Sequence, residues 1–122
     1  MKTVRHKLQQ QLSDVYGKSI KVDIFADLFD IKEEEWRNAV EGRLGRMKYA
    51  LVVEPSYSLE AAKLFRKMKG PEAENIDLIS TAAILRDKPT ARSGTLYEAV
   101  TAENGYVDGC LKRYLGFIQK CE

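Results

Sequence analysis

The segment 30–53 constrains the fold more than any other part of the chain, because a helical pattern there leads directly into a short apolar run. Two acidic residues three positions apart, Asp30 and Glu33, predict a capping box, in which each side chain satisfies a free backbone N–H of the other. Apolar residues then recur at helical spacing and predict one buried face. They are Trp36, Ala39, Val40 and Leu44. Gly45 is expected to end the helix, and the run 48–53 predicts a strand covered on both faces.

The N-terminal part, 2–16, predicts a helix with a narrow apolar stripe, since apolar residues recur there only every three or four positions. The stripe consists of Val4, Leu8, Leu12 and Val15. Its width is that of a coiled-coil seam, and no helix elsewhere in the chain is an obvious partner for it. We therefore expect residues 1–17 to be the stub of a coiled coil and residues 18–122 to form the folded domain.

The rest of the chain alternates between helical patterns and short apolar runs, with glycine, proline or asparagine at most boundaries. Short strands are expected at 19–22, 76–79 and 117–121, and single helical turns at 24–29 and 81–85. Helices are expected at 58–69 and 106–115, closed by Gly70-Pro71 and Gly116, and a short helix at 95–102 before a turn at Asn104-Gly105. The segment 87–94 is the most loop-like. This alternation predicts an α/β domain with a short mixed sheet flanked by helices.

No pattern of a catalytic, cofactor or metal site is present in the sequence. A phosphate-binding loop of the G-x-x-x-x-G-K-[ST] type is missing, and Gly42 and Gly45 precede a predicted strand, so they cannot form a dinucleotide-binding turn. The single histidine, His6, lies in a polar helical stretch and is expected to be a solvated surface residue. The two cysteines, Cys110 and Cys121, have neither a disulfide-framework nor a metal-ligand spacing, so we expect small core residues. We expect no enzymatic activity, no metal and no cofactor.

Length and charge indicate one globular domain, because 122 residues suffice for a hydrophobic core. The longest apolar runs fall well short of the roughly 18 to 20 residues of a membrane-spanning helix, and the N-terminus lacks the apolar core of a signal peptide. An intracellular protein is therefore expected. A net charge of +2 does not by itself imply nucleic-acid binding. Basic residues cluster locally on two predicted helices, where a solvated surface is the simpler interpretation and contact with the DNA backbone the alternative.

Three segments resemble the hinge of one class of SMC-family proteins. The first is 25–55, FADLFDIKEEEWRNAVEGRLGRMKYALVVEP, with an Ala-Asp-Leu lead, a Lys-x-x-x-Trp-x-x-Ala-Val-Glu-Gly helix and a strand ending in Val-Glu-Pro. The second is 93–104, SGTLYEAVTAEN, and the third is 114–122, YLGFIQKCE. In this order they are similar to the hinge of MukB-like, or Wadjet-type, ATPases of bacterial chromosome-organising and plasmid-defence complexes.

The resemblance implies a homodimerisation domain at the far end of a long antiparallel coiled coil. We then expect the sequence to be part of a longer cytoplasmic, nucleoid-associated protein whose ATPase head lies elsewhere, and we expect the two ends of the fold to lie side by side. The dimer interface is predicted on the C-terminal helix and strand, at Tyr106, Leu111, Tyr114 and Phe117. Auxiliary DNA contact without sequence specificity is predicted at Lys63, Arg66, Lys67, Lys112 and Arg113.

The chain also departs from these relatives. The stretch 78–87, LISTAAILRD, lacks a Val-Asp-Thr-Glu-Lys-like sequence, and the chain is too short for the two-subdomain hinge of conventional SMC proteins. The alternative hypothesis is a free-standing small α/β domain that binds, or acts as an enzyme on, an anionic ligand at the carboxyl ends of its strands. A third hypothesis is an adaptor that binds nucleic acid without dimerising.

Overall fold

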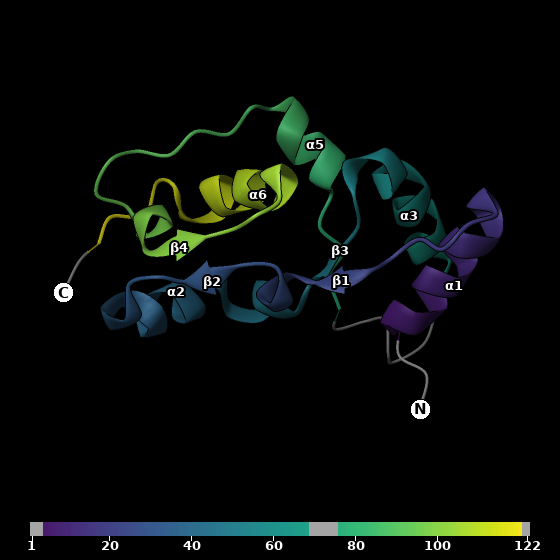
Figure 1. Cartoon of the computed structure of the whole chain (residues 1–122), viewed down its shortest axis with the longest axis horizontal. Helices are drawn as coiled ribbons and strands as arrows, with labels where there is room; N and C mark the ends of the chain where they lie inside the picture. Colours follow the sequence, from purple (N-terminus) through teal and green to yellow (C-terminus); the bar gives the residue numbers. More distant parts are fainter. Residues whose placement is uncertain (1–3, 69–75, 121–122) are drawn as a thin grey trace.

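The computed structural model describes residues 4–68 and 76–120, which form a small α/β domain with two short antiparallel sheets (Figure 1). The α-helices in these residues are α1 (Val4–Tyr16), α2 (Arg37–Leu44), α3 (Pro55–Lys67), α5 (Thr81–Arg86) and α6 (Gly105–Leu115). The strands are β1 (Asp23–Ile24), β2 (Asp30–Ile31), β3 (Leu51–Val52) and β4 (Val100–Thr101). Turns of 3-10 helix are η1 (Phe25–Asp27), η2 (Glu34–Trp36), η3 (Gly45–Tyr49) and η4 (Leu96–Ala99). The predicted α/β class is confirmed.

The strands pair in two places instead of forming the single mixed sheet that we expected. β1 pairs antiparallel with β3, and β2 pairs antiparallel with β4. Leu51 of β3 also forms an isolated parallel bridge to Leu78, so β3 lies between two neighbours. The backbone N–H of Leu51 donates to the carbonyl of Asp77 at 2.8 Å, and the N–H of Ile79 donates to the carbonyl of Leu51 at 2.9 Å.

β3 is covered on both faces, as the sequence predicts. Leu51 and Val53 belong to one cluster of buried residues, which also contains the α1 side chains and Ala61 of α3. Ala50 and Val52 belong to the other cluster, which is built on α2, η4 and α6. Since successive side chains of a strand point to opposite faces, this one segment joins the two halves of the core.

The partner of the α1 stripe is α3 of the same chain, so the prediction that the stripe has no partner within the chain is wrong. Leu8 and Leu12 are completely buried, whereas Val15 is 54% exposed. Gly17 ends the helix with φ of 66°, and the ring of Tyr16 packs 4.8 Å from that of Tyr57. The stripe is therefore part of the core of the domain. A coiled coil that continues before Val4 stays a prediction.

The predicted capping box at the start of the 30–53 segment is wrong. Asp30 lies in β2 opposite Thr101, and the backbone N–H groups of Lys32 and Glu33 donate to the carbonyl of Ala99. Pairing with β4 thus holds the segment extended, and α2 begins only at Arg37, after η2. The prediction of the buried face is correct for Val40 and Leu44, but Trp36 is half-buried and Ala39 is exposed. Gly45 ends the helix, and η3 then shortens the predicted strand to β3.

Several of the other elements lie close to their predicted positions. The predictions of α5, α6, the helical turn near 25 and the loop 87–94 are correct, whereas the expected strand 19–22 is replaced by β1. α3 begins at Pro55, because proline suits the first position of a helix. Two predictions are wrong here. In place of the expected helix 95–102 the chain forms η4 and then β4, and in place of the expected strand 117–121 Gln119 forms an isolated antiparallel bridge to Thr95. Lys69, Gly70-Pro71 and Cys121 lie outside the described residues.

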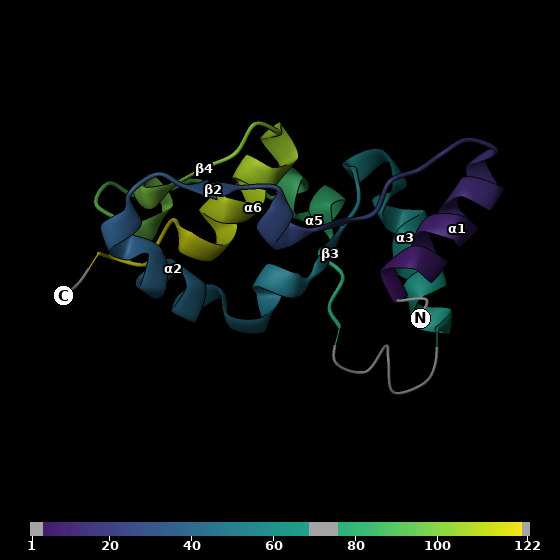
Figure 2. The same ribbon diagram turned by 60° about the horizontal axis from the view of Figure 1, so that its bottom comes forward.

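The two ends of the described chain lie far apart along the long axis of the molecule (Figures 1 and 2). Val4 begins α1, which packs against α3. Lys120 lies near the start of α2, where its ammonium group is 2.7 Å from a carboxylate oxygen of Glu33. The expectation that the two ends lie side by side is therefore wrong for the described residues. Within 4–68 and 76–120, no helix is both long and apolar enough to cross a membrane.

Truncation of the α1 stripe tests its place in the core. We expect Leu8→Ala and Leu12→Ala each to lower the free energy of unfolding by about 2–5 kcal/mol, because each removes a fully buried side chain. Val15→Ala is the matched control and should change it by less than about 0.5 kcal/mol, because Val15 is exposed. Urea unfolding followed by circular dichroism measures all three. Equal, small effects at Leu8 and Val15 would show that α1 does not pack on this domain.

Candidate functional site

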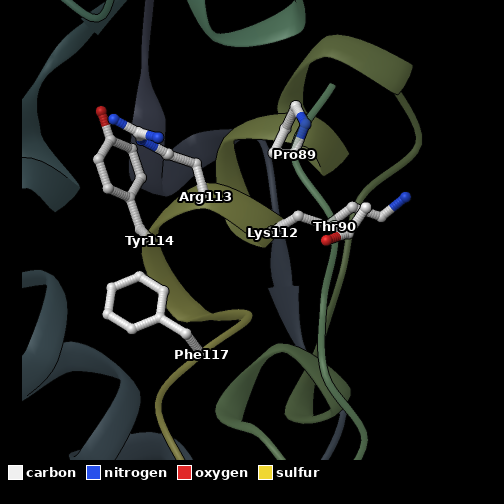
Figure 3. A pocket seen from close by; sticks show the side chains of 6 residues that line it. All are labelled: Pro89, Thr90, Lys112, Arg113, Tyr114 and Phe117. Carbon is white, nitrogen blue, oxygen red and sulfur yellow. The ribbon is translucent and has the colours of Figure 1, made fainter. Parts of the chain in front are cut away.

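An open cavity of about 450 Å³ lies between the C-terminal end of α6 and the loop 87–94 (Figure 3). Its described lining consists of Pro89, Thr90, Lys112, Arg113, Tyr114 and Phe117. Two of these side chains are cationic and two are aromatic, and no acidic side chain is among them. The cavity therefore combines positive charge with exposed apolar surface.

Contact between the loop and the end of α6 shapes this cavity. The backbone N–H of Arg92 donates to the carbonyl of Gly116 at 2.7 Å. A Cβ atom at Gly116 would lie closest to the carbonyl oxygen of Lys112, and 2.9 Å from both the carbonyl oxygen of Thr90 and the Cα of Ala91. Only glycine allows two backbone segments to approach this closely. Gly116 therefore ends α6, as the sequence predicts, and also holds the loop against it.

The two aromatic residues of the cavity differ in exposure. Tyr114 is half-buried, and its ring centroid lies 6.1 Å from that of Phe25 in the core. Burial raises the pKa of the Tyr114 hydroxyl above its usual value. Phe117 is 60% exposed and follows directly after the end of α6. Its ring is therefore apolar surface available to a partner.

The two cationic residues also differ. The ammonium group of Lys112 is 3.3 Å from a carboxylate oxygen of Asp108 and 5.9 Å from the ring centroid of Tyr97. The hydroxyl of Tyr97 donates to the same carboxylate, and burial together with Asp108 raises the pKa of Tyr97 to about 12. Arg113 is exposed and forms no ion pair within the described residues. Figure 3 shows Arg113 on the side of α6 that carries Tyr114, and Lys112 directed toward Thr90.

The structure brings together only two of the four predicted interface residues. Tyr114 and Phe117 both line the cavity. Tyr106 lines a separate cavity of about 420 Å³ with Asn104 and Glu54 at the start of α6. Leu111 is completely buried in the core cluster, so its predicted place in an interface is corrected: its side chain is not on the surface.

The five predicted DNA-binding residues fall into two groups. Lys63, Arg66 and Lys67 lie on α3, with their side chains exposed. Lys112 and Arg113 lie on α6, and α5 packs between the two helices (Figures 1 and 2). The five residues therefore lie on two separate helices, each of which packs against α5.

Nothing in the described residues groups three or more potential metal ligands. Cys110 is completely buried, and burial raises its thiol pKa to about 12, which agrees with the predicted core role. The site residues that sequence reasoning missed are Pro89 and Thr90, because their contact with α6 depends on tertiary packing. The available signal was Gly116, whose lack of a side chain allows that contact.

Neither protein-family models nor curated proteins match this chain. The fold and the cavity define a small α/β domain with an open basic and aromatic surface at the end of its last helix. Function is therefore inferred from the residues themselves and from the resemblance of the three segments.

Substitution of Gly116 tests how the cavity is held. We expect Gly116→Ala to lower the free energy of unfolding by about 1–3 kcal/mol, because its methyl group would overlap both the Lys112 carbonyl at the end of α6 and the loop backbone. Gly42→Ala is the control: nothing lies within 4 Å of the added methyl group in α2, so helix propensity should stabilise the protein by about 0.5–1 kcal/mol. Urea unfolding gives both values, and hydrogen exchange at the Arg92 amide should be faster in Gly116→Ala. Unchanged exchange there would mean that Gly116 does not hold the loop.

Proposed function

We propose that this chain is a homodimerisation domain of the hinge type, from an SMC-like ATPase complex that handles DNA. The observation that carries the proposal is that the three segments with resemblance to such hinges assemble into one body. Residues 25–55 contribute Phe25 and Val52 to its core cluster, residues 93–104 contribute Leu96 and Val100, and residues 114–122 contribute Leu115. α1 and α3, which fall largely outside these segments, build the other cluster.

Polar contacts also join the three segments. β2, in the segment 25–55, pairs with β4, in the segment 93–104. Thr95 of the segment 93–104 forms a β-bridge to Gln119 of the segment 114–122. The ammonium group of Lys120 lies 2.7 Å from Glu33 and 3.4 Å from Glu98. The hydrogen bond to Glu33 is the main reason that the pKa of Lys120 is raised. Segments that resemble one family in sequence order and also share contacts favour a common structural origin.

The surface that we assign to a second copy is centred on Phe117 and Tyr114. A two-fold dimer places the same patch of both copies face to face, so an exposed ring beside a half-buried one is suited to it. Aromatic residues are enriched at protein interfaces.

The positions of the chain ends count against the joining of two coiled-coil arms in one copy. The two ends of the described chain lie far apart along the long axis of the molecule (Figure 1), so a helix entering at Val4 and a chain leaving at Lys120 would not start as neighbours. The proposal therefore covers self-association and does not extend to arms that start as neighbours. A cytoplasmic, nucleoid-associated location belongs to the same proposal and is supported by the resemblance alone.

Self-association is tested at the exposed apolar residues. We expect Phe117→Ala to weaken the dimer at least about tenfold, since aromatic residues at the centre of an interface contribute most of its affinity. Leu59→Ala is the matched control, because Leu59 on α3 is 68% exposed and does not line the cavity. Sedimentation velocity over a range of protein concentrations measures the dissociation constants. A dimer that is weakened by Leu59→Ala and not by Phe117→Ala would place the interface elsewhere.

Auxiliary DNA contact is the second part of the proposal and is tested by charge reversal of the two basic groups separately. Substitution to Glu at Lys63, Arg66 and Lys67 removes the α3 group, and substitution at Lys112 and Arg113 removes the α6 group. Each lost phosphate contact should reduce the slope of log affinity against log salt concentration by about 0.9 on duplex DNA. Fluorescence anisotropy measures this slope, and each variant serves as the comparison for the other. Unchanged affinity and slope in both would rule out DNA contact at these residues.

A second candidate function is a monomeric module, or an enzyme, for an anionic ligand. The observation that favours it is the cavity with two cationic and no acidic side chains in its described lining. It predicts a concentration-independent monomer, which the sedimentation measurement distinguishes from the dimer.

A further inference from the structure

The pair Asn104-Gly105 connects β4 to α6, and Asn104 is the N-cap residue of that helix. Asn104 is exposed and has an extended backbone, with φ of −88° and ψ of 134°. Its side chain forms no capping hydrogen bond, although asparagine is one of the residues best suited to this position. The carboxamide group is therefore not held at the helix start and is able to turn toward the main chain.

An asparagine that precedes glycine is chemically labile, because the main chain itself supplies the nucleophile. The backbone nitrogen of Gly105 gives up its proton and attacks the side-chain carbonyl carbon of Asn104. A bond between this nitrogen and Cγ forms, the bond between Cγ and the NH2 group breaks, and the NH2 group takes up a proton and leaves as ammonia. Water then opens the resulting succinimide ring at either carbonyl, which gives aspartate or isoaspartate. Water is the only other reactant.

The fold opposes this reaction only weakly. Closing the ring requires the Cβ of Asn104 and the nitrogen of Gly105 to eclipse each other about the Cα–C bond, and the present ψ of 134° keeps them apart. Rotation about this bond breaks the hydrogen bond from the backbone N–H of Asp108 to the carbonyl of Asn104, at 3.0 Å, which is the first of α6. Helix ends open more easily than any other part of a helix.

We propose that Asn104 is a site of spontaneous deamidation, at which the folded chain gains a negative charge at the start of α6. The new carboxylate would line the same cavity as Glu54 and Tyr106. Aspartate caps a helix as well as asparagine does, and the helix dipole favours its charge, so this product keeps the fold. Isoaspartate adds a methylene carbon to the main chain between β4 and α6, so this product loosens the start of the helix.

The experiment incubates the full chain at mildly alkaline pH, in native buffer and in urea, and follows each asparagine by mass spectrometry of proteolytic peptides. We expect Asn104 to react in the native chain no more than about tenfold more slowly than in urea, because the rotation breaks a single hydrogen bond. Asn38 is the internal control: it is also exposed, but it lies within α2 and precedes Ala39. It should stay unchanged in the native chain.

Gly105→Ala is the matched variant, since nothing lies within 4 Å of the added methyl group and the fold is expected to be kept. It should slow the reaction of Asn104 at least about tenfold in both states, because the methyl group hinders the approach to the nitrogen and restricts its backbone. Modification of Asn104 in urea but not in native buffer would show that the fold protects the pair, and this overturns the inference. Equal rates in Gly105→Ala and wild type, or native modification of Asn38 as fast as that of Asn104, also overturn it. The proposed self-association is not affected by any of these outcomes.

Discussion

The placement of β3 is the constraint on which the rest of the structure depends. Its side chains alternate between two apolar clusters, so that Leu51 and Val53 pack with α1 and α3, while Val52 packs with α2 and α6. Its backbone pairs with β1 on one side and bridges to Leu78 on the other. With both faces and both edges occupied, the segment cannot shift by one residue without exposing its apolar side chains.

The candidate site forms where the last helix ends. The helical spacing of α6 buries Leu111 and Leu115 in the core and leaves Arg113 outside. Gly116 then lets the loop 87–94 approach the helix end, which turns an exposed aromatic residue and two cations into the lining of one cavity. Core packing and surface chemistry thus arise from the same short stretch of sequence.

Local signals predicted α6 closely, because it has an apolar stripe of helical spacing and Gly116 at its end. An apolar stripe also predicted α3, although the helix begins at Pro55, three residues before the predicted start at 58. The same kind of reasoning failed at Asp30 and Glu33. Their spacing matches a capping box, but pairing of β2 with β4, a segment about seventy positions away, holds the backbone extended there. A contact between distant segments overrode a weak local preference, as helix-capping patterns are worth only about 1 kcal/mol.

The sequence by itself determined the α/β class, the buried character of β3 and the apolar face of α6, since each follows from the period of its apolar residues. Only the tertiary structure decided that α1 packs on α3, that the ends of the described chain lie far apart, and that Arg113, Phe117 and the loop 87–94 share one cavity (Figures 1 and 3). The physical reason is that periodicity shows which face of an element is buried, while the choice of the surface that covers it depends on how distant segments meet.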